Sequence, residues 1–280
     1  MLHVSILALL ATMALAGPLP SSNSLLEDRS PSAQSSYITA CEAADNCETY
    51  VDPTTGRPNI RFKTGMEPGT EDYTSRLAKS KTKRQSGYPQ TQVTVGDTTV
   101  SWGCGIDPVA TLGNVSSICA TSGQCIPTDS WSTSVNFPPS WPGGNWASES
   151  LTITATGTYP SWIHNGLVEG IQAVMSAKGV ITTSTVKWFD DNRPTGGQRP
   201  PQKRDGSCQV AKAPNFIGLG VYSSLNTLEA TIGVSIALQT QQNGFCTTIS
   251  SISGAIAGAF GPEGAGLAAI FGIISATCSL

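Results

Sequence analysis

Six of the eight cysteines of this chain divide evenly around a dibasic pair, Lys203–Arg204. Cys104, Cys119 and Cys125 come before the pair, and Cys208, Cys246 and Cys278 come after it. If a protease of the secretory pathway cuts after Arg204, each product holds an odd number of thiols. In an oxidising compartment an odd thiol pairs elsewhere or stays reactive. We therefore expect at least one disulfide to join the two products.

The spacing of the cysteines indicates disulfides rather than a metal site. Cys41 and Cys47 lie six residues apart, as do Cys119 and Cys125, and no C-x-x-C pair occurs. Cysteine-based zinc sites usually need closer pairs. Cys41 and Cys47 can close a small loop of their own, and the pairing of the other six cysteines stays open. We expect no metal and no cofactor.

Residues for catalysis are scarce. His164 and His3 are the two histidines, so an H-E-x-x-H zinc site is excluded and a histidine-based triad would depend on His164 alone. We expect His164 to be a capping or surface residue. Asp190 and Asp191 are adjacent, and neighbours on a strand point to opposite faces. They do not predict a pair of catalytic carboxylates, and we expect no catalytic residue and no enzyme.

The N-terminus predicts secretion. Val4–Ala16 is almost entirely apolar, and Ala14, Leu15 and Ala16 form a small-x-small cleavage site. This run of about 13 residues is shorter than the ~20 needed to span a bilayer, which disfavours an N-terminal anchor. Residues 1–16 are therefore expected to be a signal peptide, cut after Ala16, and the mature protein is expected to be extracellular with disulfides.

Residues 17–84 have the composition of a propeptide. They are polar, lack a sustained apolar period, and hold nine of the sixteen Lys and Arg residues of the chain. They end in Lys83–Arg84, after which no basic residue occurs before Lys178. We expect a cut after Arg84; the alternative is a disordered linker with a solvated charge run.

The second dibasic pair lies in a stretch rich in Gly and Pro, residues 192–207. Such a stretch predicts an exposed loop, where proteases act. A chance dibasic pair is the alternative. A cut after Arg204 would divide the mature part into a first chain, residues 85–204, and a second chain, residues 205–280.

The first mature chain is predicted to combine strands with one helix. Two β-branched runs around Gly96 and Asp97 predict a hairpin over residues 91–102. A loop-rich, cysteine-bearing segment follows, and it includes the glycosylation sequon of Asn114. Residues 149–157 and 182–189 alternate as strands do, and an amphipathic helix with Ser161 as N-cap lies between them. This order indicates a β-α-β unit.

In the second mature chain, residues 216–222 and 228–238 predict an antiparallel pair joined by a turn. From 228 to 238 every second residue is apolar. Together these elements predict an α+β fold, a mixed sheet with an amphipathic helix, built from both chains and linked by disulfides.

The C-terminal residues 249–278 contain one charged side chain, Glu263. Gly and Pro at 261–264 divide them into two apolar halves with small residues every fourth position, which predicts a helical hairpin. Three interpretations stay open: a buried core hairpin, a membrane-active hairpin, or a removable lipid-anchor signal. In the membrane interpretation, the residues that contact lipid are Phe260, Ile270, Phe271 and Ile273.

The mature part carries seven basic and ten acidic residues and no basic cluster, so we expect no nucleic-acid partner. The order of signal, propeptide ending in Lys83–Arg84, first chain, Lys203–Arg204, and second chain with an apolar tail resembles that of fungal killer preprotoxins.

The resemblance is one of organisation over the whole chain. It implies processing by a kexin-type protease and a secreted two-subunit toxin that acts on a membrane or wall component of competitor cells. This chain departs from that family in having few basic residues in its mature part, which disfavours simple electrostatic attraction to membranes. The alternative function is that of a non-lytic secreted effector or a cell-surface binding protein.

Overall fold

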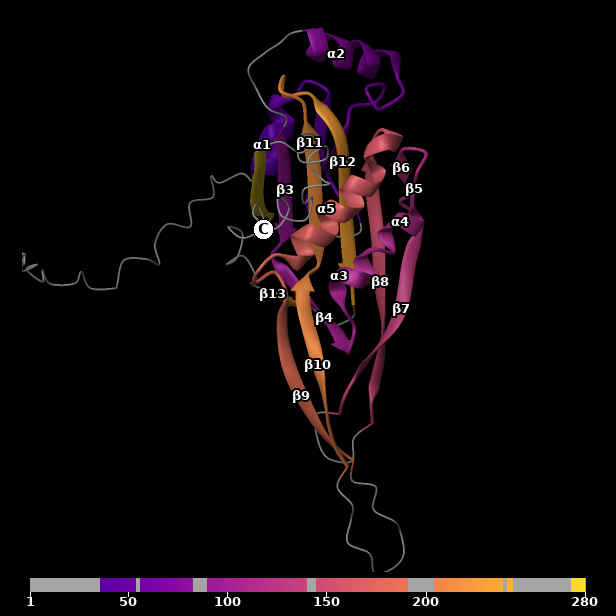
Figure 1. Ribbon diagram of the computed structural model, residues 1–280, viewed down its shortest axis with the longest axis vertical. Coiled ribbons are helices and arrows are strands. Elements are labelled where there is room, and N and C mark those ends of the chain that lie inside the picture. Colours follow the sequence, from indigo (N-terminus) through magenta and orange to yellow (C-terminus); the bar gives the residue numbers. More distant parts are fainter. Residues whose placement is uncertain are drawn as a thin grey trace, which may run out of the picture. The chain divides into compact units, whose positions relative to one another are not determined.

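Strands dominate the residues that the computed structural model describes, which are 36–53, 56–82, 90–139, 145–190, 204–238, 241–243 and 273–279 (Figure 1). The predicted signal peptide and its cleavage position Ala16 lie outside these residues, as do Lys83, Arg84, Lys203 and Cys246. Residues Gln34–Leu280 cluster as one compact unit.

The described part of the predicted propeptide folds into two helices and a two-stranded antiparallel sheet. These elements are α1 (Ser36–Ala43), β1 (Cys47–Val51), β2 (Pro58–Phe62) and α2 (Glu71–Thr82). We call residues 36–82 the N-terminal segment. The apolar pattern of this segment is weak, and α1 buries only Tyr37 and Cys41. The alternative interpretation, a disordered linker, is wrong for residues 36–82.

The remaining elements belong mostly to two larger sheets. They are β3 (Gln90–Gly96), β4 (Thr98–Cys104), α3 (Pro108–Leu112), α4 (Val115–Ile118), β5 (Cys119–Ala120), β6 (Gln124–Cys125), β7 (Ser130–Phe137), β8 (Ala147–Thr158), η1 (Ser161–Ile163), α5 (His164–Ser176), β9 (Thr182–Asp190), β10 (Arg204–Pro214), β11 (Phe216–Tyr222), β12 (Leu228–Ala237), β13 (Gln241–Asn243) and β14 (Ile273–Ser279).

The larger sheet has eight strands in the order β14-β3-β11-β12-β8-β6-β5, with β7 paired to β8. Its pairs are antiparallel except β14, which runs parallel to β3, so the predicted mixed sheet is confirmed. The second sheet has four strands in the order β13-β4-β10-β9. The predicted α+β class is therefore confirmed, with two larger sheets where one was expected.

The predicted hairpin over residues 91–102 is wrong in its pairing, although both strands form. β3 pairs with β11 in the larger sheet, and β4 pairs with β10 in the smaller one. The β3–β4 segment and the β10–β11 segment both cross between the larger and the smaller sheet. They cross side by side, since the Asn215 N–H donates to the Thr98 carbonyl at 2.8 Å. Gly96 and Asp97 therefore mark a bend between two sheets and not a hairpin turn, because β3 and β4 pair with β11 and β10 instead of with each other.

The predicted helix is confirmed as α5, but not its N-cap. A 3-10 turn, η1, precedes α5, and no side chain caps its first residues. The strands on either side, β8 and β9, lie in different sheets, so the predicted β-α-β unit is wrong as a unit of one sheet. The antiparallel pair of β11 and β12 is confirmed, including its turn, in which Asn226 has a positive φ of 57°.

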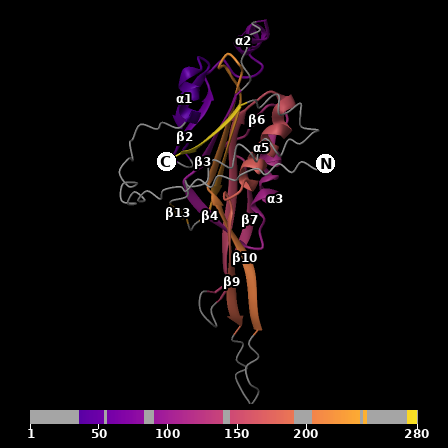
Figure 2. The same ribbon diagram turned by 60° about the vertical axis from the view of Figure 1, so that its left-hand side comes forward.

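The main core lies between one face of the larger sheet and the helices α3, α4 and α5. Figure 2 shows α3 and α5 on one side of β3, and α1 on the other. The alternating residues of β12 supply this core: Ala230, Ile232, Val234 and Ile236 are buried in it. Gly170 brings α5 close to the sheet, since an added Cβ would lie 3.0 Å from Leu219 Cδ1.

The predicted C-terminal helical hairpin is wrong for the residues that the structure describes. Residues Ile273–Ser279 form the strand β14 rather than the end of a helix. Parallel pairing with β3 satisfies the backbone groups along one edge of β14, which lies at the end of the strand order. The rest of the predicted hairpin, with Phe260, Ile270 and Phe271, lies outside the described residues.

Candidate functional site

Between the buried rings of Phe216 and Tyr222, the face of the larger sheet opposite α5 consists of threonine, glutamine and glycine. Strand pairing aligns two rows across β3, β11, β12 and β8. One row is Thr94, Gly218, Gly233 and Thr156, and the other is Gln92, Gly220, Thr231 and Thr158. We call these eight residues the threonine–glycine face. Its three glycines leave a furrow along the middle, because they carry no side chain.

The N-terminal segment fills this furrow. A Cβ added to Gly218 would lie 3.0 Å from the Tyr37 hydroxyl oxygen, and one added to Gly220 would lie 2.8 Å from Ile60 Cδ1. A Cβ on Gly233 would lie 2.8 Å from Asn59 Nδ2. Close approach of this kind is a reason for glycine inside a strand. The face and the N-terminal segment are therefore complementary in shape.

Three of the side chains above the furrow are joined by hydrogen bonds. The Tyr37 hydroxyl donates to Asn59 Oδ1 at 2.9 Å, and Asn59 Nδ2 donates to the Tyr50 hydroxyl at 3.2 Å. The Tyr50 hydroxyl in turn donates to Thr156 Oγ1 of the face at 3.4 Å. Burial raises the pKa of the Tyr37 hydroxyl well above its ordinary value and also raises the pKa of Tyr50. Both tyrosines therefore stay neutral donors over the physiological range.

Asn46 binds the backbone of the first residue of β12, Leu228. Its side-chain Nδ2 donates to the Leu228 carbonyl at 2.8 Å, and its Oδ1 accepts from the Leu228 N–H at 2.9 Å. Asn46 and Leu228 are both fully buried. The amide thus takes the place of a neighbouring strand, and loss of such a buried partner costs about 1–3 kcal/mol per unsatisfied group.

The edges of this interface carry further polar contacts. Arg57 forms an ion pair with Asp97 and donates to Thr98 Oγ1 at 2.7 Å. At the opposite end the Tyr73 hydroxyl donates to the Glu229 carbonyl at 3.0 Å. The N-terminal segment is thus held by buried hydrogen bonds at its centre and by contacts at both ends.

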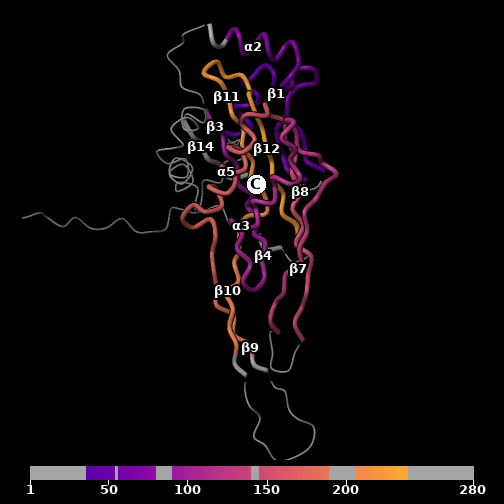
Figure 3. The backbone as a smooth tube through the Cα atoms, turned by 45° about the vertical axis from the view of Figure 1, so that its right-hand side comes forward, coloured from indigo at the N-terminus to yellow at the C-terminus, as the bar shows by residue number. Residues whose placement is uncertain are grey.

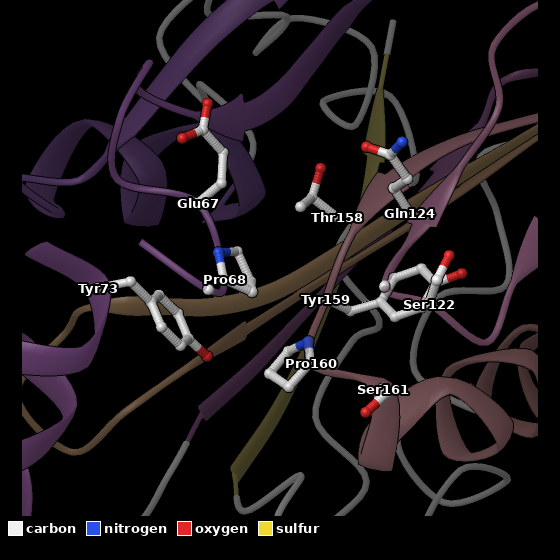
Figure 4. A pocket seen from close by; sticks show the side chains of 11 residues that line it. Glu67, Pro68, Tyr73, Ser122, Gln124, Thr158, Tyr159, Pro160 and Ser161 are labelled. Carbon is white, nitrogen blue, oxygen red and sulfur yellow. The ribbon is translucent and has the colours of Figure 1, made fainter. Parts of the chain in front are cut away.

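Two cavities lie between the N-terminal segment and the rest of the protein. One, of about 660 Å³, has Glu67, Pro68 and Tyr73 on one wall, and Figure 4 shows Tyr159 and Pro160 on the other. The second, of about 710 Å³, lies between β1–β2 and the strands β8 and β12. Its lining is Tyr50, Val51, Asp52, Pro53, Ile60, Arg61, Gln124, Cys125, Ile126, Pro127, Thr154, Thr156, Gly157, Thr158, Thr231 and Ser235.

Three disulfides are present in the part of the chain that the structure describes. Cys41 pairs with Cys47 inside the N-terminal segment, as expected for a local loop, and Cys119 pairs with Cys125. Cys104 of β4 pairs with Cys208 of β10, so this disulfide joins the two sides of Arg204. Cys278 lies in β14. Several disulfides in one chain are typical of proteins that fold in an oxidising compartment.

Arg204 is the first residue of β10, and its backbone pairs with Asp190, the last residue of β9. From Arg204 to Gln209 the only strand partner of β10 among the described residues is β9. Figure 3 shows this two-stranded ribbon beside the similar ribbon of β7 and β8. The predicted cut after Arg204 thus falls at the end of a ribbon, next to residues 191–203, which lie outside the described residues.

His164 is buried rather than exposed. Its Nε2 lies 2.9 Å from the Cys119 carbonyl oxygen and its Nδ1 lies 2.9 Å from Asn165 Oδ1. Both ring nitrogens are thus engaged in local contacts at the start of α5. These contacts hold the His164 ring inside the fold at the start of α5, so of the expected capping or surface roles the surface one is wrong.

Asn114 lies between the short helices α3 and α4. Its Nδ2 donates to the Thr111 carbonyl at 2.9 Å, and the residue is half-buried. Within the segment predicted to be rich in loops, this sequon therefore lies at a junction of two short helices, because Asp107 caps α3 and the chain turns directly into α4.

The described residues hold no cluster of three or more His, Cys, Asp or Glu residues that could bind a metal ion. Within the same residues, no helix is long and apolar enough to cross a membrane. The feature that stands out among the described residues is a polar sheet face together with the segment that covers it.

Sequence reasoning did not find the threonine–glycine face. The signal was present in the alternation of β12, since Thr231 and Ser235 face away from its apolar side. What the alternation does not show is which strands lie side by side. The rows exist only because the registers of four strands coincide.

Comparisons with protein-family models, with curated proteins and with solved structures found no match to this chain.

Proposed function

We propose that this chain is the precursor of a secreted toxin that acts on the membranes or surfaces of competitor cells as two disulfide-linked chains. The observation that carries the proposal is the Cys104–Cys208 disulfide, which joins residues before and after Arg204. A cut there leaves residues 85–204 and 205–280 linked covalently. It also leaves the pairing of β10 with β9 and β4 in place.

The N-terminal segment supports the part of the proposal that concerns processing at Arg84. This cleavage position follows directly after α2, which ends at Thr82, and β3 begins at Gln90. The disulfide described within the segment, Cys41–Cys47, is internal to it. A cut after Arg84 therefore separates a folded propeptide that is held to the mature part by non-covalent contacts.

The lipid-contacting part of such a toxin is proposed to be the apolar stretch that includes Phe260, Ile270 and Phe271. Ile273, the fourth residue predicted to contact lipid, is the first residue of β14. Pairing of β14 with β3 ties the end of this stretch to the larger sheet. Insertion into a membrane would then use the residues before β14.

A second candidate function is that of a non-lytic secreted effector or cell-surface binding protein. The threonine–glycine face favours it, because a polar face with a central furrow offers hydrogen-bonding groups and space for a ligand's side chains. Both candidates share the same maturation and differ in what the mature protein does to a lipid bilayer.

Mass spectrometry of the secreted protein before and after reduction tests the processing. The wild type should give a two-chain species that separates into residues 85–204 and 205–280 only when reduced. The double variant Cys104→Ser/Cys208→Ser should separate without reduction under denaturing conditions. A matched control, Lys203→Ala/Arg204→Ala, should stay one chain. A single uncut wild-type species from residue 85 onward would overturn the two-chain model.

Dye leakage from liposomes, measured with the processed protein, separates the two candidate functions. A toxin that acts on membranes should release dye, and the variants Gly258→Leu and Gly272→Leu should lose this activity while they are still secreted. Binding to target cells without dye release would instead support the non-lytic alternative.

A further inference from the structure

We infer that the N-terminal segment is a latency domain: after a cut at Arg84 it stays bound on the threonine–glycine face, and that face becomes available only when the segment dissociates. The inference rests on the proposed processing at Arg84. It adds that the cut alone does not activate the protein, because a second, reversible step follows.

The contacts that hold the segment do not depend on the peptide bond after Arg84. The Asn46 amide binds the buried backbone of Leu228 through two hydrogen bonds. One apolar cluster contains Tyr37, Ile60 and Phe62 of the segment together with Tyr222 and Leu228 of the larger sheet. These contacts remain when the connection between α2 and β3 is broken.

The N-terminal segment also covers the glycines and polar side chains of this face that a ligand would contact. Tyr37, Asn59 and Ile60 lie directly above Gly218, Gly233 and Gly220. Thr94 and Gln92, at the β3 end of the two rows, are buried, although threonine and glutamine are usually exposed. No ligand can enter the furrow while these three side chains occupy it.

Other features make the bound state reversible. No disulfide among the described residues joins the segment to the larger sheets. Cavities of about 660 and 710 Å³ interrupt the interface. Within the described residues, the buried oxygens Thr94 Oγ1 and Tyr222 OH lack a hydrogen-bond partner, and such groups weaken an interface. The segment is thus bound by complementary contacts, without a covalent link through the disulfides of the described residues.

The test uses the full chain with a site for a sequence-specific protease placed at residues 83–89. The change Lys203→Ala/Arg204→Ala keeps the rest of the chain uncut. After cleavage, size-exclusion chromatography and native mass spectrometry at falling protein concentration give the dissociation constant of the segment. Hydrogen exchange at β12 reports whether the face is covered, and the Leu228 amide is the most direct probe because it donates to Asn46.

In the wild type, the cut segment should co-elute with the rest of the protein, and the exchange of the Leu228 amide should stay slow. Asn46→Ala should raise the dissociation constant at least about tenfold, and about 100-fold if both hydrogen bonds are lost without replacement. A matched control is Glu48→Ala, which removes an exposed ion pair with Arg61 inside the segment and should change the constant less than about threefold.

A variant on the sheet side guards against the possibility that Asn46→Ala unfolds the segment itself. Gly233→Ala leaves the segment unchanged and places a Cβ 2.8 Å from Asn59 Nδ2. It should raise the dissociation constant about tenfold or more.

Release of the wild-type segment at once on cleavage, at any concentration, would overturn latency. So would equal constants for the wild type, Asn46→Ala and Gly233→Ala. Because cleavage is engineered, these outcomes do not depend on whether Arg84 is cut in vivo or whether the protein is toxic. Failure of the inference and failure of the proposed function can therefore be told apart.

Discussion

At the scale of single residues, this protein places several polar groups in its interior, and they differ in whether they form hydrogen bonds. His164 and Asn46 are buried and each makes two side-chain contacts with hydrogen-bond geometry. Trp102 is fully buried, and its Nε1 has no hydrogen-bond partner among the described residues. The first two residues therefore contribute to stability through hydrogen bonds, and Trp102 contributes through packing alone.

His164→Ala should lower the free energy of unfolding by about 1–3 kcal/mol, because it leaves the Cys119 carbonyl without its partner. Urea-induced unfolding measures this loss. Trp162→Ala is a control two residues away, where the side chain is 61% exposed, and it should change stability by less than about 0.5 kcal/mol. A His164→Ala protein of unchanged stability that has lost all activity would instead point to a catalytic histidine.

Trp102→Phe should change the free energy of unfolding by less than about 1.5 kcal/mol, since it removes a buried N–H that gains no hydrogen bond while keeping an aromatic ring. Trp102→Ala should cost about 3–5 kcal/mol because it opens a cavity. The same denaturation experiment compares the two variants. Equal losses would show that the indole N–H has a partner that stabilises the fold.

At the scale of elements, two ribbons of paired strands extend past the main sheets and meet through tryptophans. Trp188 of β9 lies over Gly206 of β10, where an added Cβ would be 2.3 Å from Trp188 Cζ2. The Trp188 ring also makes an edge-on contact with Trp146, next to β8, with ring centroids 4.8 Å apart. Gly206 thus makes room for the ring that joins the two ribbons.

Gly206→Val should displace Trp188 and break its contact with Trp146, at a cost of about 1–3 kcal/mol. Near-ultraviolet circular dichroism should show the loss of the tryptophan pair. Ser207→Val, at the neighbouring exposed position of β10, is the matched control and should leave the signal unchanged. An unaltered spectrum for Gly206→Val would contradict the packing of Trp188 on this glycine.

At the scale of the whole molecule, buried tyrosines connect the N-terminal segment with the larger sheet. Burial raises the pKa of Tyr159 to about 12 and shifts the pKa of Tyr73 and Tyr222 upward as well. Tyr73 belongs to the N-terminal segment, and Tyr222 and Tyr159 belong to the part that it covers. In both parts, folding therefore favours the protonated form of the buried tyrosines.

The precursor should lose stability between about pH 10 and pH 12. In this range the unfolded chain loses tyrosine protons that the folded protein keeps, so the free energy of unfolding falls as pH rises. The contribution of Tyr159 is fully present below about pH 10, and Tyr159→Phe should remove up to about 2 kcal/mol of this pH dependence. Urea unfolding at a series of pH values measures it.

Spectrophotometric titration gives an independent check. In the native precursor most tyrosines should ionise well above pH 10, and in denaturant they should ionise near their ordinary pKa of about 10. A native titration curve that matches the denatured one would contradict the burial of these side chains.

The sequence predicted those features that depend on local pattern. The strict alternation from Leu228 to Leu238 identified β12 and its apolar side, because side chains on a strand alternate between two faces. The four-residue apolar spacing identified α5. The parity of the cysteines predicted a disulfide across Arg204, since that argument needs only a count.

Only the tertiary structure decided how these elements combine. β3 and β4 form as expected, but their partners β11 and β10 are more than 100 residues away, so Gly96 and Asp97 form no hairpin turn. The N-terminal segment has too weak an apolar period to predict its fold, because much of its stability comes from the sheet against which it packs. The threonine–glycine face exists because four strand registers coincide, and register is set by long-range pairing.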